Sequence, residues 1–278
     1  MHYLRPMFFR RSFTDQKPPQ SRSPGGSDGL PASLPGLRGA SASGVEVTRM
    51  ITLGGRDVEV ILRRHAKARR ISLRVDTRRD AAVLTLPPRT AEREAIAFLM
   101  KHGDWITDQI DALPARIHFE AGAEIPFLGR DRLLVHTPEM RGTVRLDPLD
   151  ESQLQVAGAA EHFARRVTDF MKREARAAIK PLVADKAARI GRQAGRIILR
   201  DQRTRWGSCT SSGDLNFSWR LIYCPPDVLD YVVAHEVAHL RHMDHSPAFW
   251  ATVAEIAPTP KQTRAWLRHN GHRLHRIG

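Results

Sequence analysis

The chain has 278 residues, of which 41% are hydrophobic and 27% charged, the ordinary usage of a globular protein of one or two domains. Only two cysteines occur and no apolar run approaches the ~20 residues of a membrane-spanning helix, which argues against a disulfide scaffold and a transmembrane protein. The 44 Lys and Arg exceed the 30 Asp and Glu by 14, and this charge favours nucleic acid, an anionic membrane surface or acidic substrates as partners.

Residues 1–44 are rich in Ser, Pro, Gly and Arg, and we expect a disordered tail because few apolar side chains are present to offset the entropy of ordering. An organellar transit peptide and a misassigned start codon are alternative interpretations. The first residues lack the apolar core of a secretory signal, which together with the low cysteine content predicts a cytoplasmic location.

Residues 45–150 are predicted to form a β-rich N-terminal portion with one helix. The stretch 45–64 alternates apolar and polar residues around a Gly54-Gly55 turn, and two more alternating runs follow within residues 68–88. Apolar residues then recur at helical spacing from Thr90 to just before Pro114, which predicts a single helix. A short β stretch over 125–138 precedes a region of low signal near 140–158.

Residues 155–278 are predicted to form an α+β domain, which packs either separately from the N-terminal portion or as one unit with it. The domain opens with a long amphipathic helix over 159–191, interrupted or kinked at Pro181. Two strand-like runs, 196–210 and 215–224, flank a Ser-Ser-Gly-Asp turn and predict a β-hairpin. Centring that hairpin on Ser212-Gly213 places Cys209 opposite Asn216 and Cys224 opposite Asp201, so we expect two buried thiols rather than a disulfide. A helix beginning at Pro225 and a last helix over 247–256 complete the pattern.

The string His235-Glu236-Val237-Ala238-His239 is an HExxH motif. On a helix, the two histidines lie one turn apart on the same face and can bind one metal ion, with Glu236 beside a metal-bound water. Composition predicts roughly 0.03 chance occurrences of this string. The surrounding helix is almost entirely apolar, and burying two imidazoles and a carboxylate there is costly unless they are paired or bound to metal.

A hydrolytic zinc ion typically has three protein ligands and one water, so a further ligand is required. We expect His245 to supply it after a turn of the chain near Met243-Asp244. His242 on the same helix and Glu255 on the following helix are alternatives, and zinc ligation by cysteine is a weaker one.

The run from Arg203 to Trp250 resembles the YgjP-like metallopeptidase family, which is related to the WLM and SprT-like zincins, and residues from about 45 to 270 fit its layout. The resemblance implies a zincin-like fold with the HExxH helix and a β-hairpin. It also implies one zinc ion bound by His235, His239 and His245, with Glu236 as the catalytic base. Ser246, Phe249 and Trp250 match the family pattern as well, which favours His245 over Glu255.

The implied chemistry is metal-assisted hydrolysis of a peptide or protein, in which zinc activates a water and Glu236 takes its proton. Donors for the developing oxyanion are sought among Arg203, Arg205 and Tyr231, although either Arg fits a structural ion pair equally well. The Arg203–Cys209 strand is the candidate for pairing with an extended substrate, and Asn216 either contacts the site or closes the turn. Trp206 and Trp219 are expected in the core.

Two other functions use the same residues. A zinc hydrolase of nucleotides or other phosphoanhydrides could hold phosphates with the abundant Arg side chains. A protease of DNA-bound proteins, as in SprT-like relatives, fits the net charge of +14. The 37 Arg and 7 Lys are spread along the whole chain, however, and such an excess is equally typical of codon bias.

Overall fold

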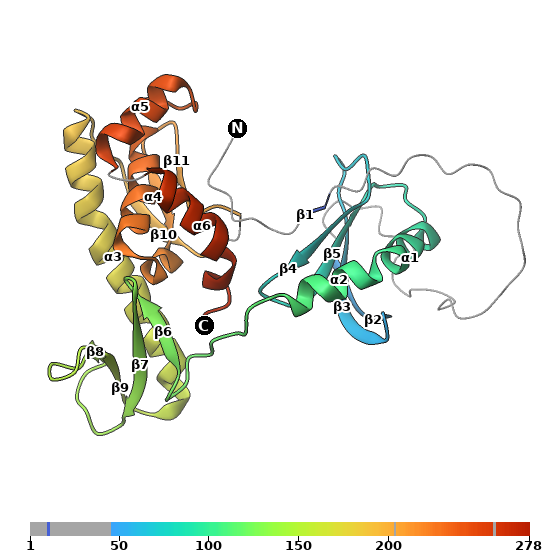
Figure 1. The fold of residues 1–278 in the computed structure, drawn as a ribbon, viewed down its shortest axis with the longest axis horizontal. Coiled ribbons are helices and arrows are strands. Elements are labelled where there is room, and N and C mark those ends of the chain that lie inside the picture. The colour runs from blue at the N-terminus through green and yellow to red at the C-terminus, as the bar shows by residue number, and fades with distance from the viewer. Residues whose placement is uncertain (1–9, 12–45, 203, 258–259) are drawn as a thin grey trace, which may run out of the picture. The chain divides into compact units, whose positions relative to one another are not determined.

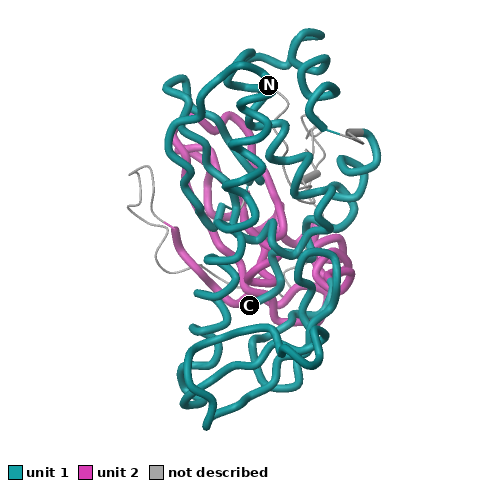
Figure 2. The backbone as a smooth tube through the Cα atoms, turned by 90° about the vertical axis from the view of Figure 1, so that its left-hand side faces the viewer, with its two compact units in different colours: residues 1–7, 114–278 teal, residues 8–113 magenta. Residues whose placement is uncertain are grey.

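The computed structural model describes residues 10–11, 46–202, 204–257 and 260–278, so the predicted tail lies almost wholly outside the described residues. The chain divides into two compact units, which Figure 2 distinguishes by colour. Unit 1 comprises residues 1–7 and 114–278, and unit 2 comprises residues 8–113.

Unit 2 is a five-stranded sheet with two helices (Figure 1). The order is β1-β4-β5-β3-β2, in which β3 and β5 are parallel and the other neighbours antiparallel. Its apolar core includes Leu53, Leu73, Leu84, Leu99 and Ile106, all essentially inaccessible to solvent. The elements are β1 (Arg10–Arg11), β2 (Glu46–Leu53), β3 (Arg56–Arg64), β4 (Ser72–Asp76), β5 (Ala81–Leu86), α1 (Glu92–Lys101) and α2 (Gly103–Asp111).

The single helix predicted between Thr90 and Pro114 is in fact two, because the helical backbone breaks at His102 (φ −113°, ψ 15°). Gly103, a weak helix former, begins the second helix and faces the side chain of Leu53. The apolar spacing of the two helices is continuous, which is why the sequence pattern does not reveal the break.

Unit 1 begins with a four-stranded sheet, order β6-β7-β9-β8, that packs on the long helix α3 (Phe163–Arg189). Figure 1 shows α3 running from this sheet to the helices that follow it in the chain. α3 is one uninterrupted helix with Pro181 inside it, so the predicted interruption does not occur. The strands are β6 (Glu124–Phe127), β7 (Arg130–Thr137), β8 (Val144–Leu146) and β9 (Gln153–Ala157), and the 3₁₀ helix η1 (Ala160–His162) precedes α3.

The division between the units falls after Leu113, well before the boundary near residue 150 that the sequence predicts. The physical reason is a shared core: Ile125 and Leu154 of the four-stranded sheet belong to the same buried cluster as Val167 and Phe170 of α3. Strand-rich composition groups residues 114–157 with the preceding strands, whereas packing places them with the following helices.

A three-stranded sheet replaces the predicted hairpin. Its strands are β10 (Ile197–Arg200), β11 (Gly207–Cys209) and β12 (Leu215–Ser218), and the order is β10-β12-β11. β12 pairs antiparallel with β11 and parallel with β10, so the run 196–210 contributes two strands on opposite sides of β12. The register places Cys209 opposite Leu215 rather than Asn216. Both cysteines are free thiols as expected, although Cys224 is buried and Cys209 only partly so.

The 3₁₀ helix η2 (Trp219–Tyr223) follows β12 where the sequence pattern predicts more strand, and three helices complete unit 1: α4 (Pro226–Ala238), α5 (Pro247–Ile256) and α6 (Pro260–Leu274). α6 was not predicted, because its sequence is mostly polar. No helix in the described part of the chain is both long and apolar enough to cross a bilayer.

Candidate functional site

The HExxH motif lies at the end of α4, a helix that is buried on almost every side. Pro226 occupies the first turn, where its missing N–H costs no hydrogen bond. All side chains from Tyr231 to Ala238 are buried, and the helix contacts α3, α5, α6 and β11. A helix that is apolar around its circumference is expected in a protein core, and here it carries His235 and Glu236 with it.

Lys186 of α3 fixes α4 and the end of α5. Its ammonium group is 2.8 Å from Asp230 Oδ1 and donates to the carbonyl oxygen of Ile256 at 2.7 Å, and the side chain is only 3% exposed. A buried lysine requires such partners, so this contact constrains the elements that bear the site.

Three imidazoles meet at the C-terminal end of α4. His235 and His239 are four residues apart on the helix, and His245 returns to them after the turn that follows. Their candidate ligand nitrogens all lie within 4.8 Å of one another, and the Nε2 atoms of His235 and His245 are 3.3 Å apart. Two nitrogens bound tetrahedrally to one zinc ion are separated by about 3.3 Å, so this pair fits the geometry of a zinc site.

Contacts around the imidazoles orient them toward one another. His239 Nδ1 donates to the carbonyl oxygen of His242 at 2.9 Å, which leaves Nε2 as the lone-pair nitrogen. The ring of Phe249, which is fully buried, lies 5.0, 4.5 and 4.7 Å from the rings of His235, His239 and His245. His245 itself is placed by Ser246, whose hydroxyl caps α5 by accepting from Phe249 N.

The protonation of the cluster suits a metal. Burial lowers the pKa of His235 well below its usual value, and the positive charges of the other two imidazoles and of Arg264 lower it further. Burial also lowers the pKa of His239. Both imidazoles are therefore neutral near pH 7, which is the form that binds metal ions.

Glu236 lies next to the three histidines and is covered by the strand β11 at a glycine. The side chain is 3% exposed, and burial raises the pKa of its carboxyl to about 8, with the charge of Arg205 acting in the opposite direction. Gly207 of β11 covers it: a Cβ atom there would lie 2.5 Å from Glu236 Cγ and 2.7 Å from Oε1. A residue with a side chain cannot occupy position 207 unless the carboxylate or the strand moves.

Gly207→Ala is therefore expected to lower hydrolytic activity about 10- to 100-fold and the free energy of unfolding by about 1–3 kcal/mol, because the added methyl group displaces Glu236. Turnover and urea denaturation of the purified variant measure these effects. Gly103→Ala is the matched control, since a Cβ there meets nothing closer than 3.6 Å. Wild-type activity in Gly207→Ala would show that the close packing of Gly207 on the side chain of Glu236 is not needed for hydrolysis.

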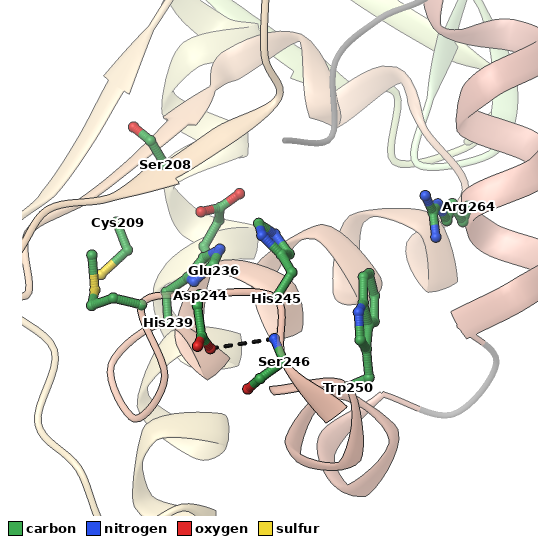
Figure 3. Close-up of a pocket in the computed structure, with 10 residues that line it drawn as sticks. Ser208, Cys209, Glu236, His239, Asp244, His245, Ser246, Trp250 and Arg264 are labelled. Atoms are coloured by element: carbon green, nitrogen blue, oxygen red, sulfur yellow. Dashed lines mark hydrogen bonds between the residues drawn. The ribbon is translucent and has the colours of Figure 1, made fainter. Parts of the chain in front are cut away.

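The cluster opens into a cavity of about 740 Å³ (Figure 3). Glu236, His239 and His245 line it, while His235 is buried and does not line it. The cavity is thus bounded by β11, by the turn after α4, and by α5 and α6. The lining residues are Ser208, Cys209, Glu236, His239, Met243, Asp244, His245, Ser246, Trp250 and Arg264.

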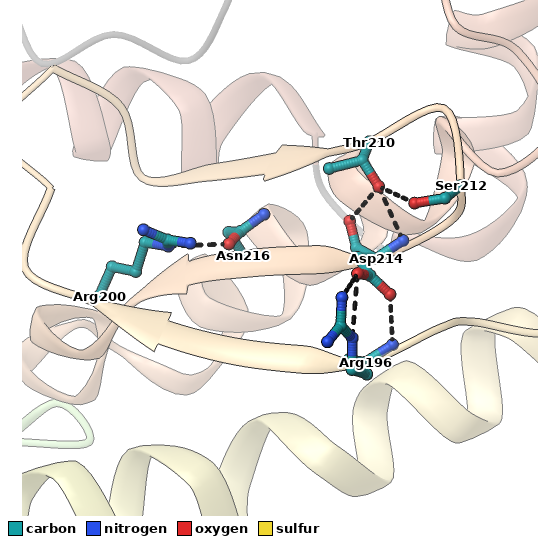
Figure 4. Close-up of polar contacts among 6 residues, drawn as sticks. All are labelled: Arg196, Arg200, Thr210, Ser212, Asp214 and Asn216. Atoms are coloured by element: carbon teal, nitrogen blue, oxygen red, sulfur yellow. Dashed lines mark hydrogen bonds and ion pairs between the residues drawn. The ribbon is translucent and has the colours of Figure 1, made fainter.

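Among the predicted substrate-binding residues that the structure describes, Arg205, Tyr231 and Asn216 do not line the cavity. Arg203 lies outside the described residues. Arg205 is exposed, and its charge is close enough to influence Glu236. Tyr231 is buried against His235, with ring centroids 6.3 Å apart and no partner for its hydroxyl among the described residues. Asn216 accepts a hydrogen bond from Arg200 Nε at 3.0 Å (Figure 4), which gives it a structural contact instead.

A polar clamp fixes the turn between β11 and β12. Asp214 accepts from the backbone and guanidinium nitrogens of Arg196, and its own N–H donates to the hydroxyl of Thr210, which also contacts Ser212 (Figure 4). The clamp ties β10, β11 and β12 together at one end. It therefore holds the strand that carries Gly207 over Glu236.

The alternatives for a third ligand lie elsewhere among the described residues. His242 contributes its carbonyl oxygen to His239, not its ring. Glu255 is half exposed and 3.8 Å from Arg241. Cys209 lies outside the histidine cluster, and burial raises the pKa of its thiol to about 11, so it is not a thiolate near neutral pH.

Comparison of the chain with known protein families and solved structures identifies its relatives. Residues 69–270 match the YgjP-like metallopeptidase domain. The chain belongs to the YgjP-like metallopeptidase family. No curated protein matches the chain. Among solved structures, the zymogen of the metallopeptidase abylysin from Pyrococcus abyssi aligns with 34% of this chain and 92% of its own length, at 18% identity and a TM-score of 0.30.

Membership of the YgjP-like family makes this chain a hydrolase of the metallopeptidase class, with a divalent metal ion and a peptide or protein substrate. The family match begins at residue 69, so it includes part of unit 2. It extends well beyond residues 155–278, which the sequence pattern marks as the catalytic domain.

Two features of the site were not predictable from the sequence. Arg264 lies on α6, the helix that was not predicted, and one arginine among 37 carries no local signal. Gly207 lies within the run from Arg203 to Trp250 that resembles the family. Only the path of the β11 backbone over α4 shows why glycine is needed at this position.

Proposed function

We propose that this YgjP-like protein is a zinc-dependent peptidase in which His235, His239 and His245 bind the ion and Glu236 is the general base. The observation that carries the proposal is the convergence of three ring nitrogens within 4.8 Å beside a buried carboxylate. Three imidazole ligands with an open fourth side are the ligand set typical of catalytic rather than structural zinc. The bound ion would supply Lewis acidity and an acidified water.

The chain's own residues supply the remaining chemistry. Glu236 accepts the proton of the attacking water and returns it to the leaving amine, and its raised pKa suits a group that both takes and gives a proton near neutral pH. Arg205 is proposed as the donor to the oxyanion, because its positive charge acts on the carboxyl group of Glu236.

The substrate backbone is proposed to pair with β11. This strand is at the edge of its sheet, bonded to β12 on one side, and Ser208 and Cys209 line the cavity. An exposed edge offers N–H and C=O groups to an extended peptide. Its three residues place such a peptide next to Glu236.

Peptide substrates are proposed over nucleotides because the family match is to metallopeptidases. A role of the basic surface in binding nucleic acid stays a prediction. Both cysteines are free thiols, which supports a reducing compartment such as the cytoplasm.

The purified wild-type chain is expected to hold about one zinc ion and to cleave an unfolded protein such as casein. Treatment with a chelator should abolish cleavage, and added zinc should restore it, because the ion held by the three histidines would supply the acidified water. Mass spectrometry of the metal and of the peptide products measures both. Zinc binding without proteolysis, but with phosphate release from nucleotides, would replace this proposal by the phosphoanhydride alternative.

A further inference from the structure

Arg264 is the one Lys or Arg among the described residues that line the cavity. It reaches the cavity from α6, whereas the three histidines and the proposed base come from α4 and the turn that follows. Neither the motif nor the proposed mechanism gives this side chain a task.

The guanidinium of Arg264 is held but not neutralised. Its Cζ lies 5.4 Å from the centroid of the Trp250 ring, a cation–π contact that restrains the side chain. No carboxylate or carbonyl among the described residues accepts a hydrogen bond from it or forms an ion pair with it. Stacking on a ring leaves the N–H groups at the edge of the guanidinium free for a planar anion.

The position of Arg264 indicates which part of a substrate it meets. In Figure 3, His245 lies between Glu236 and Arg264, and Trp250 lies next to Arg264. The ring centroid of Trp250 lies 5.8 Å from that of His245, and the guanidinium of Arg264 stacks on the same Trp250 ring. A scissile carbonyl must lie at the metal and beside Glu236, so Arg264 meets a neighbouring group instead.

The charges of the cavity lining are separated in the same direction. Glu236 and Asp244 lie on the side of His239, where Asp244 accepts from Ser246 N, and Arg264 lies on the other side (Figure 3). Asp244 repels an anionic group of the substrate from the first side, and Arg264 attracts it to the second.

We propose that Arg264 binds a carboxylate of the substrate one or two residues from the scissile bond, an inference that rests on the proposed peptidase function. The carboxylate belongs either to an acidic side chain or to the C-terminus of the peptide. Both present the same planar pair of oxygens, which a guanidinium binds through two parallel hydrogen bonds.

The test uses the zinc-loaded Glu236→Gln chain, in which bound peptides are expected to be cleaved only slowly. The probes are alanine hexapeptides with acetyl and amide ends: one neutral, a set with a single Glu at each position in turn, and one with a free C-terminal carboxylate. Calorimetry or fluorescence gives the dissociation constants. We expect either a Glu peptide or the free-acid peptide to bind at least about tenfold more tightly than the neutral one. The peptide that does so identifies the source of the carboxylate.

Adding Arg264→Gln should remove this preference and leave the affinity for the neutral peptide unchanged, which also shows that the variant is folded. Arg264→Lys should keep part of the preference, since lysine retains the charge without the paired donors. Arg268→Gln, an exposed position one turn further along α6, is the matched control.

Equal binding of all probes, or a preference that survives Arg264→Gln, would overturn the inference about Arg264. Binding is measured in a chain without the base, so absence of proteolysis by the wild-type protein would count against the proposed function alone.

Discussion

Glu236→Gln is expected to reduce peptide hydrolysis by about 10²- to 10⁴-fold while zinc content stays at the wild-type level. The amide keeps the shape of the carboxyl group and fits under Gly207, but it cannot accept the proton of the attacking water. The three imidazoles are untouched, so the site still holds the ion. Initial rates on a peptide found to be cleaved, together with metal analysis of the same sample, measure both effects.

Glu255→Gln is the matched control for this variant. Glu255 lies on α5, is half exposed and near Arg241, and does not line the cavity. The Glu255→Gln variant should therefore hydrolyse the peptide at the wild-type rate. Full activity in Glu236→Gln would show that another group takes the proton.

His245→Ala is expected to weaken zinc binding more than about 100-fold, because it leaves two protein ligands on one helix where three are needed. The ion should be lost during purification or dialysis, and hydrolysis should fall with it. Inductively coupled plasma mass spectrometry after dialysis against trace chelator gives the zinc content per chain.

His242→Ala separates this effect from damage to the turn. His242 lies in the same turn and contributes its backbone carbonyl, which alanine keeps. That variant should retain its zinc. Equal zinc content in His245→Ala and the wild type would remove His245 from the ligand set and reopen the choice of a third ligand.

The site was predictable from the sequence where its residues are close together along the chain. Spacing of four on a helix is a local rule, so His235 and His239 follow from the motif once α4 is recognised as helical. The need for a turn before His245 follows from the same rule, because ten residues of straight helix would rotate its side chain away from His235. The structure brings these three rings together as expected.

Features decided by packing between distant segments were not predictable. The sequence pattern shows that residues 196–210 are extended, but not that β10 and β11 flank β12 on opposite sides. The apolar face of residues 114–157 gives no indication of its partner, which is α3 rather than the preceding strands. α6 has too few apolar residues for a helical pattern to stand out, so Arg264 could not be placed in the cavity.

The short strand β11 adjoins both the proposed base and the proposed path of the substrate. If an extended peptide pairs with this strand and the strand moves, Gly207 moves with it and changes its position relative to the side chain of Glu236. Engagement of the substrate backbone and alignment of the base are then mechanically coupled. Proline has no N–H with which to complete such a pairing, so a peptide with proline opposite β11 would align the base poorly. Selectivity would thus arise from the main chain of the substrate as well as from its side chains.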